Sequence, residues 1–246
     1  MKTVLSLERV VGGYSLNKPV LHGISFQVHP GEMVGLIGLN GAGKSTIMKH
    51  ILGLIKPQGG SISIYGRTLD EDPEAYRSSF AYVPETPLLY NELTVREHLR
   101  LTAMAYGIHE SDYRARADRL LEEFHMFNSM NTLSEHLSKG MRQKVMIMSA
   151  FLAEPSLYII DEPFLGLDPL GIRSLLERMQ RMKRQGSSVL LSSHILSMIE
   201  TFCDRFVVLH EGSILAQGTL EEIGRQAGLS GRTLEELFYS LVKGGK

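Results

Sequence analysis

The chain has 246 residues, 43% of them hydrophobic, and its 26 basic and 27 acidic residues leave a formal net charge of −1. A chain of this length can bury a sizeable core, and we expect one domain with a smaller lobe. Acidic and basic residues are interleaved and form no basic stripe, so we expect no nucleic acid as the main partner.

Other classes of protein are disfavoured as well. The single cysteine, Cys203, excludes an internal disulfide and a cysteine-based zinc site, which suits a reducing cytosol. No uncharged run approaches the ~18 residues that a membrane-spanning helix needs. Glu8 and Arg9 follow Met1 too closely for a signal peptide. We therefore expect a chain that is soluble by itself.

The first segments, 4–11 and 24–28, are rich in β-branched and aromatic residues and are interrupted by Gly12-Gly13 and Pro30-Gly31. This pattern predicts strands of an antiparallel edge sheet. Tyr14 follows the two glycines, where the backbone can turn sharply and present an aromatic ring at the rim of the sheet. Such a ring suits stacking on a purine base, and an ordinary core tyrosine is the alternative.

A phosphate-binding loop is predicted next, because residues 38–46 fit the pattern G-x-x-x-x-G-K-S/T after an apolar run, 33–37. Glycines let successive N–H groups converge on phosphate oxygens at the start of a helix, where the helix dipole is positive. Lys44 is expected to pair with the β- and γ-phosphates and Ser45 to hold Mg²⁺. A glycine-rich hairpin is the alternative. The candidate nucleotide-binding residues of this loop are Gly38, Asn40, Gly41, Ala42, Gly43, Lys44, Ser45 and Thr46.

Strands are predicted at 61–65 and 80–83, and the chain from 84 to 155 then has the pattern of a mostly helical lobe. Its helices are expected at 93–99, 113–127 and 138–153. A helical insertion in an α/β core gives two surfaces that can rotate against each other. Ser138 and Gly140 begin the last of these helices, whose N-terminus can receive an anion. From these residues alone, a plain helix cap is the favoured interpretation.

The segment 157–160 is a largely apolar strand that ends in two adjacent acids, Asp161 and Glu162. In a parallel sheet this edge binds ligands, and two carboxylates there are costly unless a metal or a reacting water uses them. Asp161 would reach Mg²⁺ through its water shell, and Glu162 would orient or deprotonate the attacking water.

The remaining chain continues the α/β pattern with a turn at 164–169, a helix to about 184 and a strand at 188–192. His194 follows that strand, where it can donate a hydrogen bond to a γ-phosphate, although a lone histidine is usually structural. A hairpin is predicted from 206–209 and 214–216. The tail, 219–246, is expected to be helical and to pack on the core through one apolar face.

In this order the motifs resemble the ATP-binding subunit of ABC transporters along the entire chain. The residues that carry the resemblance are Tyr14 as the adenine-stacking aromatic, 38–46 as Walker A, Glu85 at the Q-loop, 138–143 as the signature, Asp161 and Glu162 as Walker B, 166–168 as the D-loop and His194 as the switch histidine. The resemblance implies a P-loop NTPase fold: an α/β, RecA-like mixed sheet with an antiparallel β edge sheet and the inserted helical lobe 84–155, within one domain, 1–246.

The resemblance also implies an ATPase that uses ATP and Mg²⁺. The implied catalytic residues are Glu162, His194, Lys44, Glu85 and Asp168, and the implied metal-binding residues are Ser45, Glu85 and Asp161. Ser138, Lys139 and Gly140 would close on ATP held by a second copy of the chain. The implied partners are that second copy and an integral membrane permease subunit, which would place the chain in the cytoplasm on the inner face of the cell membrane.

The chain departs from the family pattern at two places. Glu85 stands where the family usually has glutamine, which adds a charge near Mg²⁺ and the attacking water. Lys139 and Met141 replace the glycine and glutamine of the usual L-S-G-G-Q signature. Neither change removes a required group, because Ser138 and Gly140 remain.

Other readings of the sequence stay open. A soluble ABC-type ATPase without a transport role is the alternative, although the chain lacks the long coiled coil, second ATPase domain or zinc elements of such proteins. A P-loop kinase would need an acceptor site and no signature helix. The apolar segment 87–91, which contains Leu88, Leu89 and Tyr90, is expected to contact the membrane subunit. Its alternative role is packing into the helical lobe.

Overall fold

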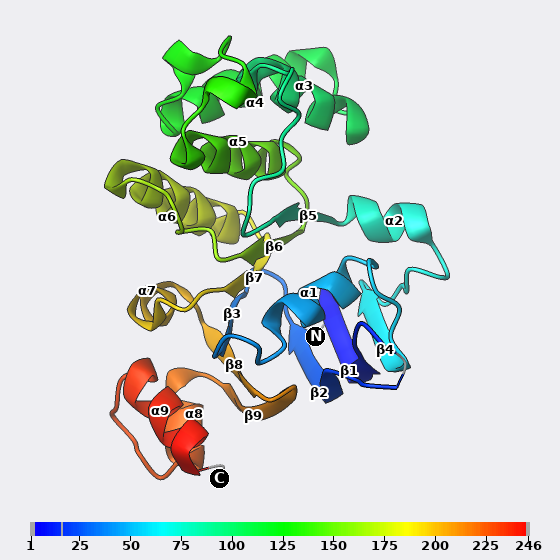
Figure 1. Ribbon diagram of the computed structural model, residues 1–246, viewed down its shortest axis with the longest axis vertical. Coiled ribbons are helices and arrows are strands. Elements are labelled where there is room, and N and C mark those ends of the chain that lie inside the picture. Colours follow the sequence, from blue (N-terminus) through cyan, green and yellow to red (C-terminus); the bar gives the residue numbers. More distant parts are fainter. Residues whose placement is uncertain (1–2, 16, 245–246) are drawn as a thin grey trace.

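The computed structural model describes residues 3–15 and 17–244. Its centre is a six-stranded sheet in the order β5-β6-β7-β3-β8-β9 (Figure 1). The strands are β3 (Met33–Gly38), β5 (Phe80–Val83), β6 (Leu157–Asp161), β7 (Ser188–Ser192), β8 (Arg205–His210) and β9 (Ser213–Gly218). All neighbours pair in parallel except β8 and β9, which form the predicted hairpin. The mixed α/β fold expected from the sequence is confirmed.

Both faces of this sheet are buried, as the short apolar runs of its strands require. In β6, Leu157 and Ile159 belong to one core cluster, whereas Tyr158 and Ile160 belong to another. Successive side chains of a strand point to opposite faces, so a strand covered on both sides is apolar throughout. Polar side chains of the sheet are therefore confined to the strand ends.

The antiparallel strands form a separate sheet beside the central one. It consists of β1 (Leu5–Gly12), β2 (Leu21–Val28) and β4 (Gly59–Ile64), with β1 in the middle. Together with α1 (Lys44–Ile51) it packs over one face of the central sheet in a shared apolar cluster. This arrangement fixes the start of α1 relative to the strand that precedes it.

The chain between β5 and β6 is helical and lies at one end of the molecule, in green in Figure 1. Its helices are α3 (Val95–Ala105), α4 (Glu110–Glu123) and α5 (Lys139–Leu152), with short 3₁₀ turns at Phe127–Ser129 and Ser134–His136. Thr94 and Glu97 form a capping box at the start of α3. The helix α4 ends before residue 127, where the sequence predicted its end, because His125 adopts a left-handed φ of 57° that breaks the helix.

The other helices are α2 (Pro73–Ser78), α6 (Pro169–Arg184), α7 (Leu196–Phe202), α8 (Leu220–Gln226) and α9 (Leu234–Gly244). Sequence analysis missed α2 and α7, which are only six and seven residues long. The sequence did contain a signal for the start of α2: Asp72 is a favourable N-cap residue, and proline follows it at the first helical position. Among the described residues, no helix has the length and apolar character needed to cross a membrane.

The helical lobe shares its core with the central sheet. Phe151 on α5 packs edge-on against Tyr158 of β6, with ring centroids 5.5 Å apart, and lies 6.3 Å from Phe124, which follows α4. All three side chains are almost completely buried. The lobe and the sheet are therefore expected to unfold together.

We predict that Phe151→Ala lowers the free energy of unfolding by about 3–5 kcal/mol, because it removes a large buried ring and leaves a cavity. Urea denaturation followed by circular dichroism should still show a single transition. Phe127→Ala is the matched control: that ring is 43% exposed, so its loss should change stability by less than about 0.5 kcal/mol. A separate early transition in the Phe151 variant would show that the lobe folds on its own.

Candidate functional site

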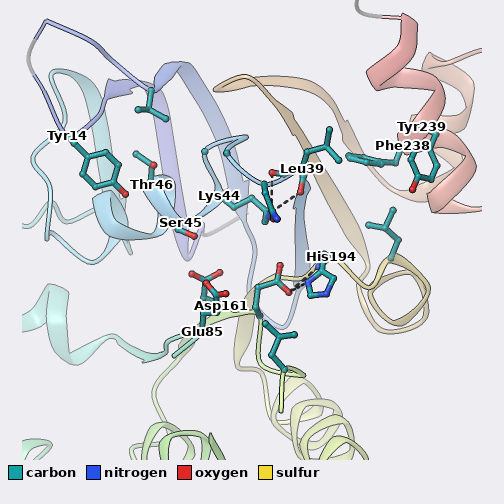
Figure 2. Close-up of a pocket in the computed structure, with 18 residues that line it drawn as sticks. Tyr14, Leu39, Lys44, Ser45, Thr46, Glu85, Asp161, His194, Phe238 and Tyr239 are labelled. Atoms are coloured by element: carbon teal, nitrogen blue, oxygen red, sulfur yellow. Dashed lines mark hydrogen bonds and ion pairs between the residues drawn. The ribbon is translucent and has the colours of Figure 1, made fainter. Parts of the chain in front are cut away.

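A pocket of about 730 Å³ lies at the carboxyl ends of β3, β6 and β7 (Figure 2). It extends from Tyr14, next to the antiparallel sheet, past the loop between β3 and α1, to Phe238 and Tyr239 on α9. Parallel strands end at the same edge of a sheet, so loops distant in sequence meet here. Tyr14 and the predicted residues of the phosphate-binding loop line the pocket, except Ala42, which is buried.

The loop between β3 and α1 is shaped to receive an anion. Gly43 precedes α1 with a φ of 110°, which a residue with a Cβ rarely adopts, and a Cβ there would also come within 3.0 Å of Leu21 Cδ2. The first N–H groups of α1 have no partner within the helix, and the helix dipole makes this end positive. Backbone and dipole therefore favour negative charge at the same point.

Lys44 places its ammonium group in the centre of this loop. The side chain is buried, and its Nζ donates hydrogen bonds to the carbonyl oxygens of Gly38 at 2.8 Å and Leu39 at 3.4 Å. A buried ammonium needs such acceptors, because desolvation otherwise disfavours its charge. The loop thus holds a cation beside unpaired N–H groups, an arrangement that suits a polyphosphate.

Asp161 is buried at the end of β6 and accepts a hydrogen bond from the Ser192 hydroxyl. Burial raises the pKa of its carboxyl group, and the charge of Glu162 raises it further, while Ser192, Ser45 and Lys44 oppose this. Glu85, Asp161 and Ser45 all line the pocket at this edge (Figure 2). Their side-chain oxygen atoms are the kind that Mg²⁺ prefers.

Within residues 3–15 and 17–244, no three histidine, cysteine or acidic side chains are grouped closely enough to hold a metal by themselves. Ser45, Asp161 and Glu85 line the pocket and could supply oxygen atoms to a cation, with others from phosphate or water. This fits Mg²⁺, which keeps several waters and is commonly bound through one or two carboxylates plus substrate phosphates.

Glu162 and His194 form a close pair at the same edge. Oε2 of Glu162 lies 2.7 Å from His194 Nδ1 and accepts a hydrogen bond from the His194 backbone N–H at 3.1 Å. The backbone N–H of Glu162 donates to Ser192 O, which holds the residue at a left-handed φ of 48°. Strained backbone of this kind persists only where the surroundings enforce it, and it is common at active sites.

Tyr14 stands at the opposite end of the pocket and is 64% exposed. A hydrogen bond with the Thr46 side chain, together with the nearby Lys49 ammonium, holds the pKa of its hydroxyl below the usual value. Lys49 Nζ lies 5.0 Å from the centre of the ring. These contacts fix an exposed aromatic ring beside the start of α1.

The structure does not bring all predicted site residues together. Ser138, Lys139 and Gly140 begin α5 outside the pocket, and the Ser138 hydroxyl accepts a hydrogen bond from Met141 N. Asp168 also lies outside it, where it caps α6 through Gly171 N at 2.7 Å. These residues form a second surface of the same molecule.

That second surface is held together by two contacts between α5 and the segment before α6. A Cβ on Gly140 would lie 2.4 Å from Gly166 O, so the two backbones approach as closely as glycine allows. The buried Lys144 ammonium lies 3.1 Å from the Asp168 carboxylate. The start of α5 and the turn before α6 are therefore expected to move together.

Sequence analysis missed several residues that line or support the pocket: Val20, Leu165, Ser192, Leu196, Phe238 and Tyr239. The position of Ser192 at the end of the apolar strand 188–192 could have indicated that it supports the site. Phe238 and Tyr239 had no such signal, because a tail helix with one apolar face is most simply explained by core packing. Phe238 does pack in the core, since it is only 5% exposed, but its ring also lines the pocket.

Comparison with known proteins gives matches that cover most of the chain. Residues 21–165 match the family model described as ABC transporter. The chain is 55% identical, over 98% of its length and 97% of the relative, to the ABC-type transporter ATP-binding protein EcsA of Bacillus subtilis (strain 168). It is 40% identical over its full length, and all of the relative, to the ABC transporter ATP-binding protein YthP of the same organism.

A solved structure of an ATP-binding subunit of an ABC transporter is 56% identical, covers 98% of this chain and 100% of that chain, and superposes with a TM-score of 0.95. The match therefore includes the central sheet, the helical lobe and the C-terminal helices. Sequence, fold and pocket agree, and the chain belongs to the ABC transporter family as an ATP-binding subunit with ATPase activity.

Proposed function

We propose that this subunit hydrolyses Mg²⁺-bound ATP in a head-to-tail pair of identical chains and drives a separate integral membrane permease subunit. The observation that carries the proposal is the division of the site into two surfaces. Lys44, Asp161, Glu162 and His194 meet in one pocket, whereas the signature residues lie outside it. A second copy can supply the missing surface.

Each pocket residue has a role that follows from its position. The adenine base stacks on Tyr14, and the N–H groups of residues 38–46 with the Lys44 ammonium bind the phosphates. Bound Mg²⁺, held by Ser45, Asp161 and Glu85, would neutralise charge that develops on the phosphates. Glu162 orients the attacking water and accepts its proton, and His194 holds the Glu162 carboxylate in place while facing the γ-phosphate.

The second copy completes the site from its signature. Ser138, Lys139 and Gly140 present the N-terminus of α5, which attracts the γ-phosphate of ATP in the partner's pocket. Asp168 acts through Lys144, because this ion pair ties α5 to the turn before α6. ATP then bridges the two chains until hydrolysis removes the bridge. ATP binding therefore closes the dimer, and hydrolysis opens it.

The permease contact is assigned to the segment after Glu85, within the helical lobe 84–155. Leu88 is 79% exposed and Tyr90 is 63% exposed. Buried His98 holds the segment, because its Nε2 accepts a hydrogen bond from Tyr90 N at 2.9 Å. Leu89 does not share this exposure: it packs against the core of the lobe. Both leucines were expected to face the partner. In the structure Leu88 is free to do so, whereas Leu89 is partly buried.

The high identity to EcsA makes a permease of the Ecs type the partner that we propose. Such a complex would place this chain in the cytoplasm, on the inner face of the cell membrane. The alternative, a soluble ABC-type ATPase without a transport role, would not co-purify with a membrane permease.

We predict that Glu162→Gln lowers ATP turnover by about 10²–10⁴-fold while ATP binding is kept, since the amide retains the shape but cannot accept a proton. With ATP and Mg²⁺ the variant should accumulate as a dimer in gel filtration. Lys44→Ala is the control for binding and should lose ATP affinity in an equilibrium assay. Adding Ser138→Arg to Glu162→Gln should abolish the dimer but keep ATP binding. A dimer that survives Ser138→Arg would contradict the head-to-tail arrangement.

We predict that Asp161→Asn abolishes turnover but stabilises the nucleotide-free chain. Burial raises the pKa of Asp161, so its ionised form opposes folding at pH values above the pKa of the unfolded chain. Asparagine removes that charge and can still accept the Ser192 hydrogen bond. The melting temperature at pH 7 should rise by about 2 °C, and the difference should shrink as the pH falls and Asp161 becomes protonated. A lower melting temperature in the variant would show that the carboxylate is fully compensated.

We predict that Leu88→Asp leaves the subunit folded and able to hydrolyse ATP but prevents co-purification with the permease subunit, because a charge would have to be buried in an apolar contact. Leu54→Asp is the matched control, since Leu54 is 70% exposed but lies in the connection between α1 and β4, outside the segment 87–91. Normal co-purification of the Leu88 variant would place the permease contact elsewhere.

A further inference from the structure

The C-terminal helix α9 reaches the wall of the ATP pocket. Phe238 and Tyr239 line the pocket at the end away from Tyr14, and Figure 2 shows the Phe238 ring extending from α9 toward Leu39 of the phosphate-binding loop. Phe238 is 5% exposed and shares a core cluster with Ile37, which directly precedes that loop, and with Ile199 of α7. Phe238 thus belongs to the cluster in which the tail, the strand before the phosphate-binding loop and α7 pack together.

The helix α7 begins two residues after His194, so its position decides where the histidine lies. Leu196, its first residue, lines the pocket with Phe238 and packs against the same cluster. Farther along α7, Glu200 Oε2 accepts a hydrogen bond from Leu234 N at 2.8 Å, which ties the start of α9 to α7. Leu196 and Phe238 thus share a cluster and a pocket wall at the start of α7, and a hydrogen bond joins α9 to the later part of α7.

The segment around His194 is held mainly by packing: Ile199 of α7 lies so close to β3 that a Cβ on Gly35 would be 2.5 Å away, and Ile195 packs against the core of the lobe and sheet. The helix α7 has seven residues and its N-cap, Ile195, makes no side-chain hydrogen bond, and a helix this short depends on packing for its stability. The His194 side chain is 53% exposed, so its own burial does not fix it. Its contact with Glu162 requires α7 to be held by its neighbours.

We propose that Phe238 is a positioning residue for ATP hydrolysis: it holds the N-terminus of α7 through Leu196 so that His194 meets Glu162. The inference rests on the role that the proposed function gives to His194. It assigns a catalytic consequence to a tail helix that otherwise serves as core packing. Loss of the ring would let α7 shift, and small misplacements of a catalytic group are costly.

The test is a double-mutant cycle on the purified full chain, with Phe238→Ala made alone and in the His194→Ala background. Turnover per folded molecule and equilibrium ATP binding are measured for each variant. Phe238→Ala alone should lower turnover about tenfold and change ATP affinity less than about twofold. In the His194→Ala background it should have almost no further effect. Phe238→Leu, which keeps an apolar side chain of similar reach, should restore most of the turnover.

Leu237→Ala is the matched control, because Leu237 is buried in the same cluster but does not line the pocket. It should lower the melting temperature at least as much as Phe238→Ala while leaving turnover per folded molecule nearly unchanged. An equal loss of turnover in the Leu237 variant, or a Phe238 effect that persists in full without His194, would overturn the inference and leave the proposed function intact. Wild-type turnover in His194→Ala alone would overturn the role of His194 and, with it, this inference.

Discussion

The site depends on one constraint: a parallel sheet buried on both faces can present polar groups only where its strands end. In β6 and β7 every residue is buried, so the first positions at which a charge can meet a ligand are Asp161 and the residues after it. The phosphate-binding loop leaves the same edge at Gly38. Burial of the sheet thus forces segments more than a hundred residues apart in the chain to supply one pocket.

Charges gathered at such an edge need partners, and the structure provides them for Lys44, Asp161 and Glu162. Lys44 binds loop carbonyl oxygens, Asp161 accepts from Ser192, and Glu162 is held by His194. The compensation is incomplete at Asp161, whose pKa is raised by burial. A carboxylate that destabilises the empty pocket gains free energy when a cation arrives, which couples stability to ligand binding.

The two halves of the catalytic arrangement are fastened to different parts of the molecule. The pocket residues stand on the central sheet, whereas the signature begins α5, which shares the core of the lobe and is tied to the turn before α6 by Lys144 and Asp168. A movement of the lobe would consequently shift the signature and that turn together. The exposed Leu88 segment belongs to the same lobe, so in the proposed dimer the lobe would connect ATP on the second copy with the proposed permease contact.

The sequence by itself determined the elements whose causes are local. Glycine and lysine spacing identified the phosphate-binding loop, and apolar runs ending in Asp161 and before His194 identified strands of a parallel sheet. Periodicity located α5 and α6, since their apolar faces and caps lie within the segments themselves. Helix ends were less well predicted, because α4 stops where His125 turns left-handed, and short helices such as α7 depend on tertiary packing more than on their own residues.

Only the tertiary structure decided which side chains face the pocket and which face a partner. Leu89 packs against the core of the lobe, whereas Leu88 faces outward. Asp168 pairs with Lys144 outside the pocket. Phe238 of the tail lines the same pocket as the phosphate-binding loop, which begins two hundred residues earlier. No local pattern encodes such contacts, because a residue's neighbours across a fold depend on how distant elements pack. Motif spacing therefore specified the chemistry of this ATPase, and packing specified the geometry in which its residues can act.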